Sequence, residues 1–148
     1  MAAIIMDGRA LSALLMPELR AHVDELKANF GCTPSLAAIL VGDDPASRQY
    51  VKNKQRVAAE LGCDSRTVRM KSGDATTDSL LDVIAGLNAD ASVNAILLQL
   101  PIPDSCDRFR LFDAIMPEKD LDAVGSASVV APNSPAFASP LSASSIPK

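Results

Sequence analysis

A tyrosine and a lysine, Tyr50 and Lys54, stand four residues apart in the chain. In a helix this spacing places the phenol ring and the ammonium group one turn apart on the same face. A lysine that is desolvated in a cleft has a lowered pKa and can exchange protons near neutral pH, so the pair is compatible with acid–base chemistry. The same spacing is also common on solvated helix faces, where it carries no function.

A glutamine, Gln99, stands near the carboxyl end of the apolar run at residues 95–100. A buried amide must find hydrogen-bond partners or lose roughly 1–3 kcal/mol. If this run is a strand of a parallel sheet, Gln99 lies at the same edge of the sheet as the Tyr50 and Lys54 pair. The plain alternative is that Gln99 only caps this edge of the sheet. The carboxylates expected at the same edge are Asp43 and either Asp120 or Asp122, although the last two are equally compatible with a charged turn.

Strands and helices alternate along the chain, which is typical of the α/β class. Two short apolar runs without alternation, the pattern of strands covered on both faces, lie at residues 36–41 and 95–100. Residues 63–70 form a weaker strand candidate. Helices are expected at residues 8–30, 45–61, 76–88 and 107–116. The pattern predicts three layers: a mainly parallel sheet flanked by helices.

Capping residues place the helix that carries the pair. Asp44 is a natural N-cap and Pro45 a natural first helical residue, so this helix begins at the carboxyl end of the first buried strand. Open α/β sheets bind ligands at such junctions. Within the first helix, Pro17 is expected to cause a kink or a split, and Gly31 is expected to end the helix.

Composition excludes several classes of function. The net charge of −4 and the 3% content of aromatic residues argue against nucleic-acid binding. No apolar run approaches the ~20 residues of a membrane-spanning helix, so no membrane partner is expected. The three cysteines form no C-x-x-C pair and suit reduced thiols, and the single histidine, His22, leaves no basis for a metal site. We expect a cytoplasmic protein.

The length of 148 residues suggests one domain. We expect this domain to span residues 1–125. Residues 126–148 are rich in Ala, Ser and Pro and contain no acidic residue, so they are expected to form a linker or an irregular tail.

Three motifs occur in order along the chain. They read GDDPAS at residues 42–47 followed by YVxxK at 50–54, LQLPIP at 98–103, and PEKDLD at 117–122. Together they resemble the catalytic domain of the methylenetetrahydrofolate dehydrogenase/methenyltetrahydrofolate cyclohydrolase family, over about residues 3–122. The resemblance implies the amino-terminal α/β domain of a two-domain enzyme.

The resemblance also implies roles for residues of this chain. Lys54 would transfer protons at the one-carbon bridge of the folate, with its position held by a hydrogen bond with Gln99. The ring of Tyr50 would pack against the folate, and Asp122 would grip the amino-pyrimidine edge of the pterin. The expected catalytic residues are therefore Lys54, Gln99 and Tyr50, and the expected substrate-binding residues are Tyr50, Ser47, Gln99, Leu100, Pro101 and Asp122.

The sequence departs from the family pattern in two places. The family usually has Gly after the last Asp of the third motif, whereas this chain has Ala123. Because Ala takes left-handed conformations only at a cost, we expect this turn to be reshaped. In addition, the intact family holds NADP in a Rossmann-type second domain, and this chain contains no G-x-G-x-x-G phosphate-binding turn.

The leading hypothesis is a role in one-carbon metabolism, as the catalytic domain of this oxidoreductase and cyclohydrolase without its NADP-binding half. The substrate would be a tetrahydrofolate derivative, and only the hydrolytic step would be open to the chain alone. An alternative is a non-catalytic folate-binding or assembly module of the same fold, and a third is an unrelated flavodoxin-like binding domain. A homodimer is possible.

Overall fold

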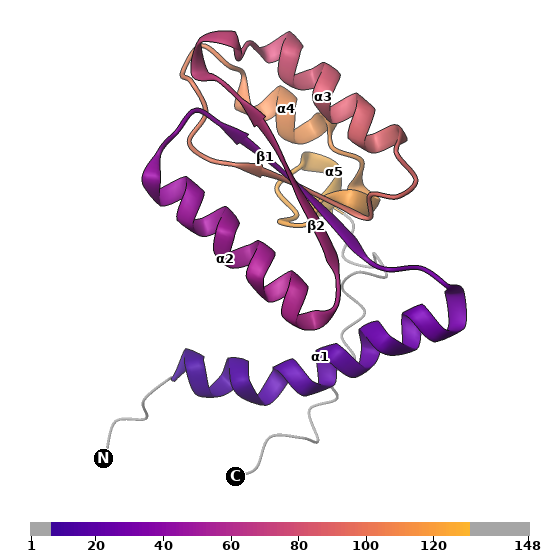
Figure 1. Ribbon diagram of the computed structural model, residues 1–148. Coiled ribbons are helices and arrows are strands. Elements are labelled where there is room, and N and C mark those ends of the chain that lie inside the picture. Colours follow the sequence, from indigo (N-terminus) through magenta and orange to yellow (C-terminus); the bar gives the residue numbers. More distant parts are fainter. Residues whose placement is uncertain (1–6, 131–148) are drawn as a thin grey trace.

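The computed structural model describes residues 7–130 of the chain. Three strands form a parallel sheet in the order β2-β1-β3, and helices lie on both sides of it (Figure 1). In chain order the elements are α1 (Gly8–Phe30), β1 (Ser35–Val41), α2 (Pro45–Leu61), β2 (Asp64–Met70), η1 (Ser72–Asp74), α3 (Thr77–Ala89), β3 (Ala95–Gln99), α4 (Arg108–Ala114), η2 (Pro117–Lys119) and α5 (Ser126–Val130).

The central strand β1 is buried on both faces, because successive side chains of a strand point to opposite sides. Ala37, Ile39 and Val41 pack with residues of α3 and α4. Ala38 and Leu40 pack on the other face, with α2. All five are at most 4% exposed. The predicted α/β fold with three layers is confirmed.

Local signals set the ends of the helices as predicted. The side chain of Asp44 accepts a hydrogen bond from the backbone N–H of Ser47 at the start of α2. Gly31 ends α1 with a φ of +61°, and Gly62 ends α2 with a φ of +81°. Of the two outcomes expected at Pro17, a kink or a split, the split does not occur, since α1 continues through this residue. Pro17 is an exposed residue, and so is Ala13, whose carbonyl loses its intrahelical partner, so water can replace the missing bond.

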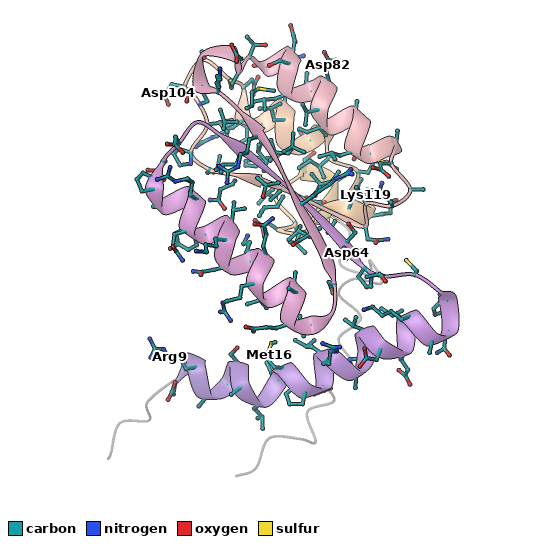
Figure 2. The ribbon with its side chains drawn as sticks, viewed as in Figure 1. Arg9, Met16, Asp64, Asp82, Asp104 and Lys119 are labelled. Carbon is teal, nitrogen blue, oxygen red and sulfur yellow. The ribbon has the colours of Figure 1, made fainter. Side chains whose placement is uncertain are left out.

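Helix α1 lies along the end of α2 and is joined to it by few side chains. Val23 is its one buried residue. Arg20 Nη1 donates to the carbonyl oxygen of Glu60 at 2.8 Å, and Lys27 Nζ donates to that of Gly62. Both cations therefore lie at the negative end of the α2 dipole. In Figure 2, side chains fill the space between the sheet and its flanking helices, while much of α1 lies away from the sheet.

The expected boundary at residue 125 coincides with the start of a further helix. Residues of α5 follow it directly, and the N–H of Ser126 donates to Asp113 Oδ1 of α4 at 2.7 Å. The first five residues of the predicted irregular tail are thus helical, and its remainder, residues 131–148, lies outside the described residues. No helix within residues 7–130 is long and apolar enough to span a bilayer.

Candidate active site

The carboxyl ends of β1 and β3 are neighbours in the sheet. After β1 the chain turns into α2 on one face, and after β3 it leads to α4 on the opposite face. Because the two connections diverge, a crevice forms between them, which is the position where open α/β sheets bind ligands.

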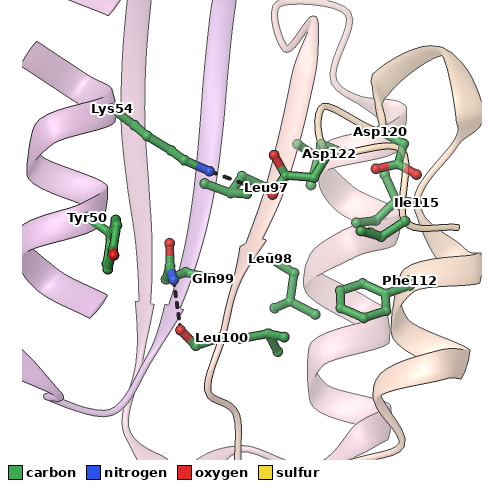
Figure 3. A pocket seen from close by; sticks show the side chains of 12 residues that line it. Tyr50, Lys54, Leu97, Leu98, Gln99, Leu100, Phe112, Ile115, Asp120 and Asp122 are labelled. Atoms are coloured by element: carbon green, nitrogen blue, oxygen red, sulfur yellow. Dashed lines mark hydrogen bonds and ion pairs between the residues drawn. The ribbon is translucent and has the colours of Figure 1, made fainter. Parts of the chain in front are cut away.

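A cavity of about 320 Å³ opens at this crevice (Figure 3). This volume lies within the range of small-molecule sites, roughly 300–1,000 Å³. Five of the predicted site residues line it: Tyr50, Lys54, Gln99, Leu100 and Asp122. The rest of the lining is mainly apolar and comes from β3, α4 and the following loop: Ile96, Leu97, Leu98, Phe112, Ile115, Asp120 and Val124. The site therefore combines an apolar wall with a few converging polar groups.

The ammonium group of Lys54 faces a carboxylate across this cavity. Its Nζ lies 3.6 Å from Asp122 Oδ2, and the two side chains are 37% and 46% exposed. In Figure 3 the lysine extends from α2 toward the loop that carries Asp122. A substrate entering the cavity would meet both charges, one from each wall.

The predicted hydrogen bond between Lys54 and Gln99 is not formed. Gln99 Nε2 instead donates to the carbonyl oxygen of Leu100 at 2.7 Å (Figure 3). The charged carboxylate of Asp122 is the stronger partner for an ammonium group, and Gln99 finds an acceptor in the adjacent peptide. Gln99 remains in the cavity wall, at the end of β3.

Ser47 lies behind the cavity instead of lining it. The residue is 2% exposed, and its Oγ lies 2.8 Å from Asp44 Oδ2 and 3.1 Å from the carbonyl oxygen of Leu100. The hydrogen bonds from the backbone N–H and the hydroxyl of Ser47 hold the pKa of Asp44 below its ordinary value. Ser47 thus joins the start of α2 to the end of β3.

Pro101 also lies outside this cavity. It lines a neighbouring hollow of about 580 Å³ together with residues of the 102–109 segment, and the Leu100–Pro101 peptide bond is cis. On the other side of the Lys54 and Asp122 pair, an apolar groove of about 550 Å³ runs between α2 and β3. Within residues 7–130, no three His, Cys, Asp or Glu side chains form a group that could hold a metal ion.

The turn that carries Asp122 differs from expectation. Ala123 adopts the left-handed conformation, with a φ of +51°, that we expected only Gly to take at low cost. Hydrogen bonds to Asp120 hold this turn: its carbonyl oxygen accepts from the N–H of Ala123 at 3.4 Å, and its Oδ2 accepts from the N–H of Gly125 at 2.9 Å. Phe112 and Ile115 also line the cavity and were not predicted as site residues. The available signal was their spacing of three, which puts two residues on one face of a helix.

Comparison with known proteins agrees with this geometry. The family model described as "Tetrahydrofolate dehydrogenase/cyclohydrolase, catalytic domain" matches residues 6–122. The bifunctional protein FolD of Anaplasma marginale is 47% identical over 124 residues, which cover 84% of this chain and 41% of that protein.

Two solved structures are similar as well. A 5,10-methylenetetrahydrofolate dehydrogenase from the silkworm Bombyx mori has a TM-score of 0.84 and 40% identity, over 88% of this chain and 44% of that one. The FolD of Trypanosoma brucei, solved with NADP cofactor and inhibitor, has a TM-score of 0.77 and 31% identity, over 82% and 41%.

The chain spans less than half the length of these relatives. The matched residues include all three motifs, which excludes an unrelated flavodoxin-like domain. The chain belongs to the tetrahydrofolate dehydrogenase/cyclohydrolase family, and residues 6–122 are its catalytic domain.

Proposed function

We propose that this chain binds a tetrahydrofolate derivative in the cavity at the ends of β1 and β3. It would serve there as the catalytic part of a methylenetetrahydrofolate dehydrogenase/methenyltetrahydrofolate cyclohydrolase. The observation that carries the proposal is the placement of Lys54 opposite Asp122 at 3.6 Å, in a cavity that Tyr50 and Gln99 also line. Two similar solved structures of about twice this length carry the names of these activities: a methylenetetrahydrofolate dehydrogenase and a methylenetetrahydrofolate dehydrogenase-cyclohydrolase.

The side chains fit distinct parts of such a substrate. The carboxylate of Asp122 can accept two parallel hydrogen bonds from the amino-pyrimidine edge of a pterin. Tyr50 is 64% exposed, so its ring is available for stacking on the ligand. Lys54 lies between them and would act at the one-carbon bridge.

Hydrolysis of a methenyl bridge requires proton transfers that a lysine can perform. The oxygen of a water molecule adds to the bridging carbon, one C–N bond breaks, and a formyl group stays on the other nitrogen. One proton of the water passes to the solvent and the other ends on the leaving nitrogen. Lys54 would relay the first proton to the solvent, and its position in the cavity would supply the geometry.

NADP does not fit the residues described here. A dinucleotide needs a glycine-rich turn at a free helix N-terminus. At the start of α2 the backbone N–H of Ser47 is already bonded to Asp44, and Asp43 adds a second carboxylate that would repel a phosphate. We therefore propose that the dehydrogenase step depends on parts found in the longer relatives.

The test uses the isolated 148-residue protein. Wild type is expected to bind 5-formyltetrahydrofolate in calorimetry and to hydrolyse methenyltetrahydrofolate faster than buffer. Lys54→Met should lose the hydrolysis. Lys52→Met, which removes an exposed lysine two residues away on the same helix, should keep it. Equal hydrolysis rates for wild type and Lys54→Met would refute the catalytic role.

A non-catalytic folate-binding or assembly module is the second candidate. The departure from the family pattern at Ala123 favours it, because this residue adopts a costly left-handed conformation in the turn that carries Asp122. The same assays separate the two: a module binds 5-formyltetrahydrofolate with no hydrolysis above buffer, whereas an enzyme shows both.

We also propose that the chain forms a homodimer in the cytoplasm. Large apolar side chains of α1 are exposed, which suits burial against a second copy: Leu11, Leu14, Leu19, Leu26 and Phe30. Cys32, Cys63 and Cys106 are free thiols, as in reducing compartments. Light scattering after gel filtration tests the dimer, and a monomeric mass at all concentrations would contradict it.

A further inference from the structure

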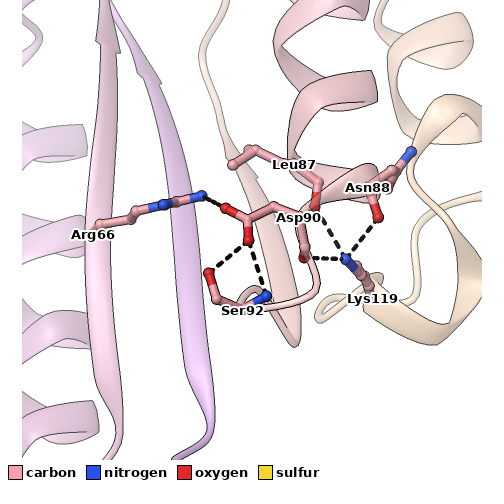
Figure 4. A network of polar contacts seen from close by, with 6 residues as sticks. All are labelled: Arg66, Leu87, Asn88, Asp90, Ser92 and Lys119. Atoms are coloured by element: carbon pink, nitrogen blue, oxygen red, sulfur yellow. Dashed lines mark hydrogen bonds and ion pairs between the residues drawn. The ribbon is translucent and has the colours of Figure 1, made fainter.

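Lys119 makes three hydrogen bonds at the end of helix α3. Its Nζ donates to the carbonyl oxygens of Leu87 at 3.1 Å, Asn88 at 2.8 Å and Asp90 at 2.8 Å (Figure 4). The ammonium group thus uses all three of its protons. It also sits at the negative end of the α3 dipole, where a cation is favoured. Lys119 does not line the cavity that holds Lys54.

The segment at the end of α3 that accepts the hydrogen bonds of Lys119 is itself held in place by further hydrogen bonds. Asp90 Oδ2 accepts from Arg66 Nη2 of β2 at 2.6 Å, and its Oδ1 accepts from the hydroxyl and the N–H of Ser92 (Figure 4). Asn88 Nδ2 donates to the carbonyl oxygen of Ala114, and its Oδ1 accepts from the N–H of Met116. The segment between α4 and η2 is therefore attached to α3 at several points.

Lys119 and Asp122 are joined by a short segment of chain that is bonded to β3. The next residue, Asp120, forms a parallel bridge with Ile96 of β3, and the N–H of Leu121 donates to the carbonyl oxygen of Ile96 at 3.4 Å. The chain then turns back at Ala123. Asp122 stands at this turn, three residues from the ammonium anchor, and points toward Lys54 (Figure 3).

The ion pair with Lys54 cannot hold this turn by itself. Both of its side chains are more than a third exposed, and exposed ion pairs contribute little. The bonds of Lys119 are charge-assisted and lie in a partly buried place, so they are the stronger attachment.

We propose that Lys119 is a positioning residue for Asp122. By fixing residues 117–120 on the end of α3, it sets where the Asp122 carboxylate stands opposite Lys54. The inference rests on the proposed function, in which that carboxylate grips the amino-pyrimidine edge of the folate.

A double-mutant cycle on the full 148-residue chain tests the proposal. Lys119→Met should weaken binding of 5-formyltetrahydrofolate in calorimetry on the order of ten- to a hundredfold, because small misplacements of a binding group cost this much. Asp122→Asn should weaken it as well. The double variant should bind no worse than Asp122→Asn alone, since Lys119 acts through that carboxylate. Lys119→Arg should restore most of the affinity, and Lys71→Met, at an exposed lysine, should bind like wild type.

Two results would overturn the inference. One is a Lys119→Met protein that melts at a lower temperature yet binds with wild-type affinity, as expected for a purely structural lysine. The other is a double variant whose loss equals the product of the single losses.

A second measurement tests the positioning role of Lys119 without the ligand. Amide hydrogen exchange should speed up in Lys119→Met at Leu121, Ala123 and Gly125, whose N–H groups are bonded in this turn, and not in β1. If wild type fails to bind the folate, the proposed function fails, and exchange still shows whether Lys119 orders the turn. Unchanged exchange at those three amides would refute the positioning role.

Discussion

The hydroxyl of Ser47 lies 3.1 Å from the carbonyl oxygen of Leu100, a residue 53 positions further along the chain. The same oxygen accepts the amide of Gln99 at 2.7 Å. One peptide group therefore connects the first turn of α2, which leads to Tyr50 and Lys54, with the end of β3. This connection holds α2 and β3, which form two walls of the cavity, in position relative to each other.

Ser47→Ala should loosen this connection. The loss of one buried hydroxyl bond is expected to lower the free energy of unfolding by about 1 kcal/mol, measured by urea denaturation. Binding of 5-formyltetrahydrofolate should weaken too, because the walls are no longer joined. Ser12→Ala, at an exposed position of α1, serves as the control and should change neither quantity. Unchanged binding in Ser47→Ala would show that Ser47 does not set the geometry of the cavity.

The ion pair between Lys54 and Asp122 should add little to stability. A double-mutant cycle with Lys54→Met and Asp122→Asn is expected to give a coupling of roughly 0.2–1 kcal/mol, because both side chains are partly exposed. The coupling should shrink at high salt, since exposed charges are screened. A coupling that is large and independent of salt would mean that the pair is structural and not held for a ligand.

Most of the fold follows from short-range patterns. The continuous apolar run of β1 predicted burial on two faces, and Asp44 with Pro45 predicted the start of α2 within one residue. The split expected at Pro17 does not occur, because the cost of a proline inside a helix depends on whether the freed carbonyl is solvated, which a sequence does not reveal. The helix at residues 126–130 was missed because its Ala- and Ser-rich sequence carries no periodic apolar pattern, and its attachment to Asp113 is a tertiary contact.

Tyr50, Lys54 and Asp122 belong to two of the three motifs and line one cavity. Their roles in that cavity stay predictions. The partner of Lys54 was wrong, because choosing between an amide and a carboxylate requires side-chain distances. The hydrogen bonds of Lys119 were also not predicted. Their acceptors are backbone carbonyl groups, which every residue type has, so the sequence does not indicate them.

Ala123→Gly should stabilise the protein. Ala at a φ of +51° pays a penalty of roughly 1–2 kcal/mol that Gly avoids. Part of this gain is lost because Gly makes the unfolded chain more flexible. We expect a net increase of about 0.5–1 kcal/mol in the free energy of unfolding.

Ala91→Gly is the matched control for this substitution. Ala91 lies in an exposed turn and has no positive φ, so Gly there should give no gain. Equal effects of the two substitutions in urea denaturation would show that the conformation of Ala123 carries no penalty.

Arg20 and Lys27 should control how firmly α1 is attached to the end of α2. Each cation caps the end of α2, where such a charge contributes about 0.3–1 kcal/mol. Arg20→Met and Lys27→Met together are expected to raise amide exchange across α1, with Val23 as its one buried side chain, while β1 remains protected. Arg9→Met, at the exposed start of α1, should leave exchange unchanged. If the double variant exchanges like wild type, other contacts hold the helix.

Acid should weaken the connection between β2 and the end of α3. Hydrogen bonds from Ser92 and Arg66 lower the pKa of Asp90 from its ordinary 3.8 to about 2. A carboxyl group with a depressed pKa in the folded state stabilises the protein fully above its unfolded pKa. This stability is lost as the pH falls from 3.8 toward about 2. Asp44 and Asp113, whose pKa values are also lowered by hydrogen bonds, act in the same direction.

The measurement for Asp90 is the melting temperature as a function of pH. Asp90→Asn should melt below wild type at neutral pH, because the carboxylate bonded to Arg66 and Ser92 is gone. Since wild type loses the same contribution when Asp90 is protonated, the two melting temperatures should converge as the pH falls through the interval between 3.8 and about 2. A difference in melting temperature that stays constant down to about pH 2 would show that the charge of Asp90 does not stabilise the connection between β2 and the end of α3.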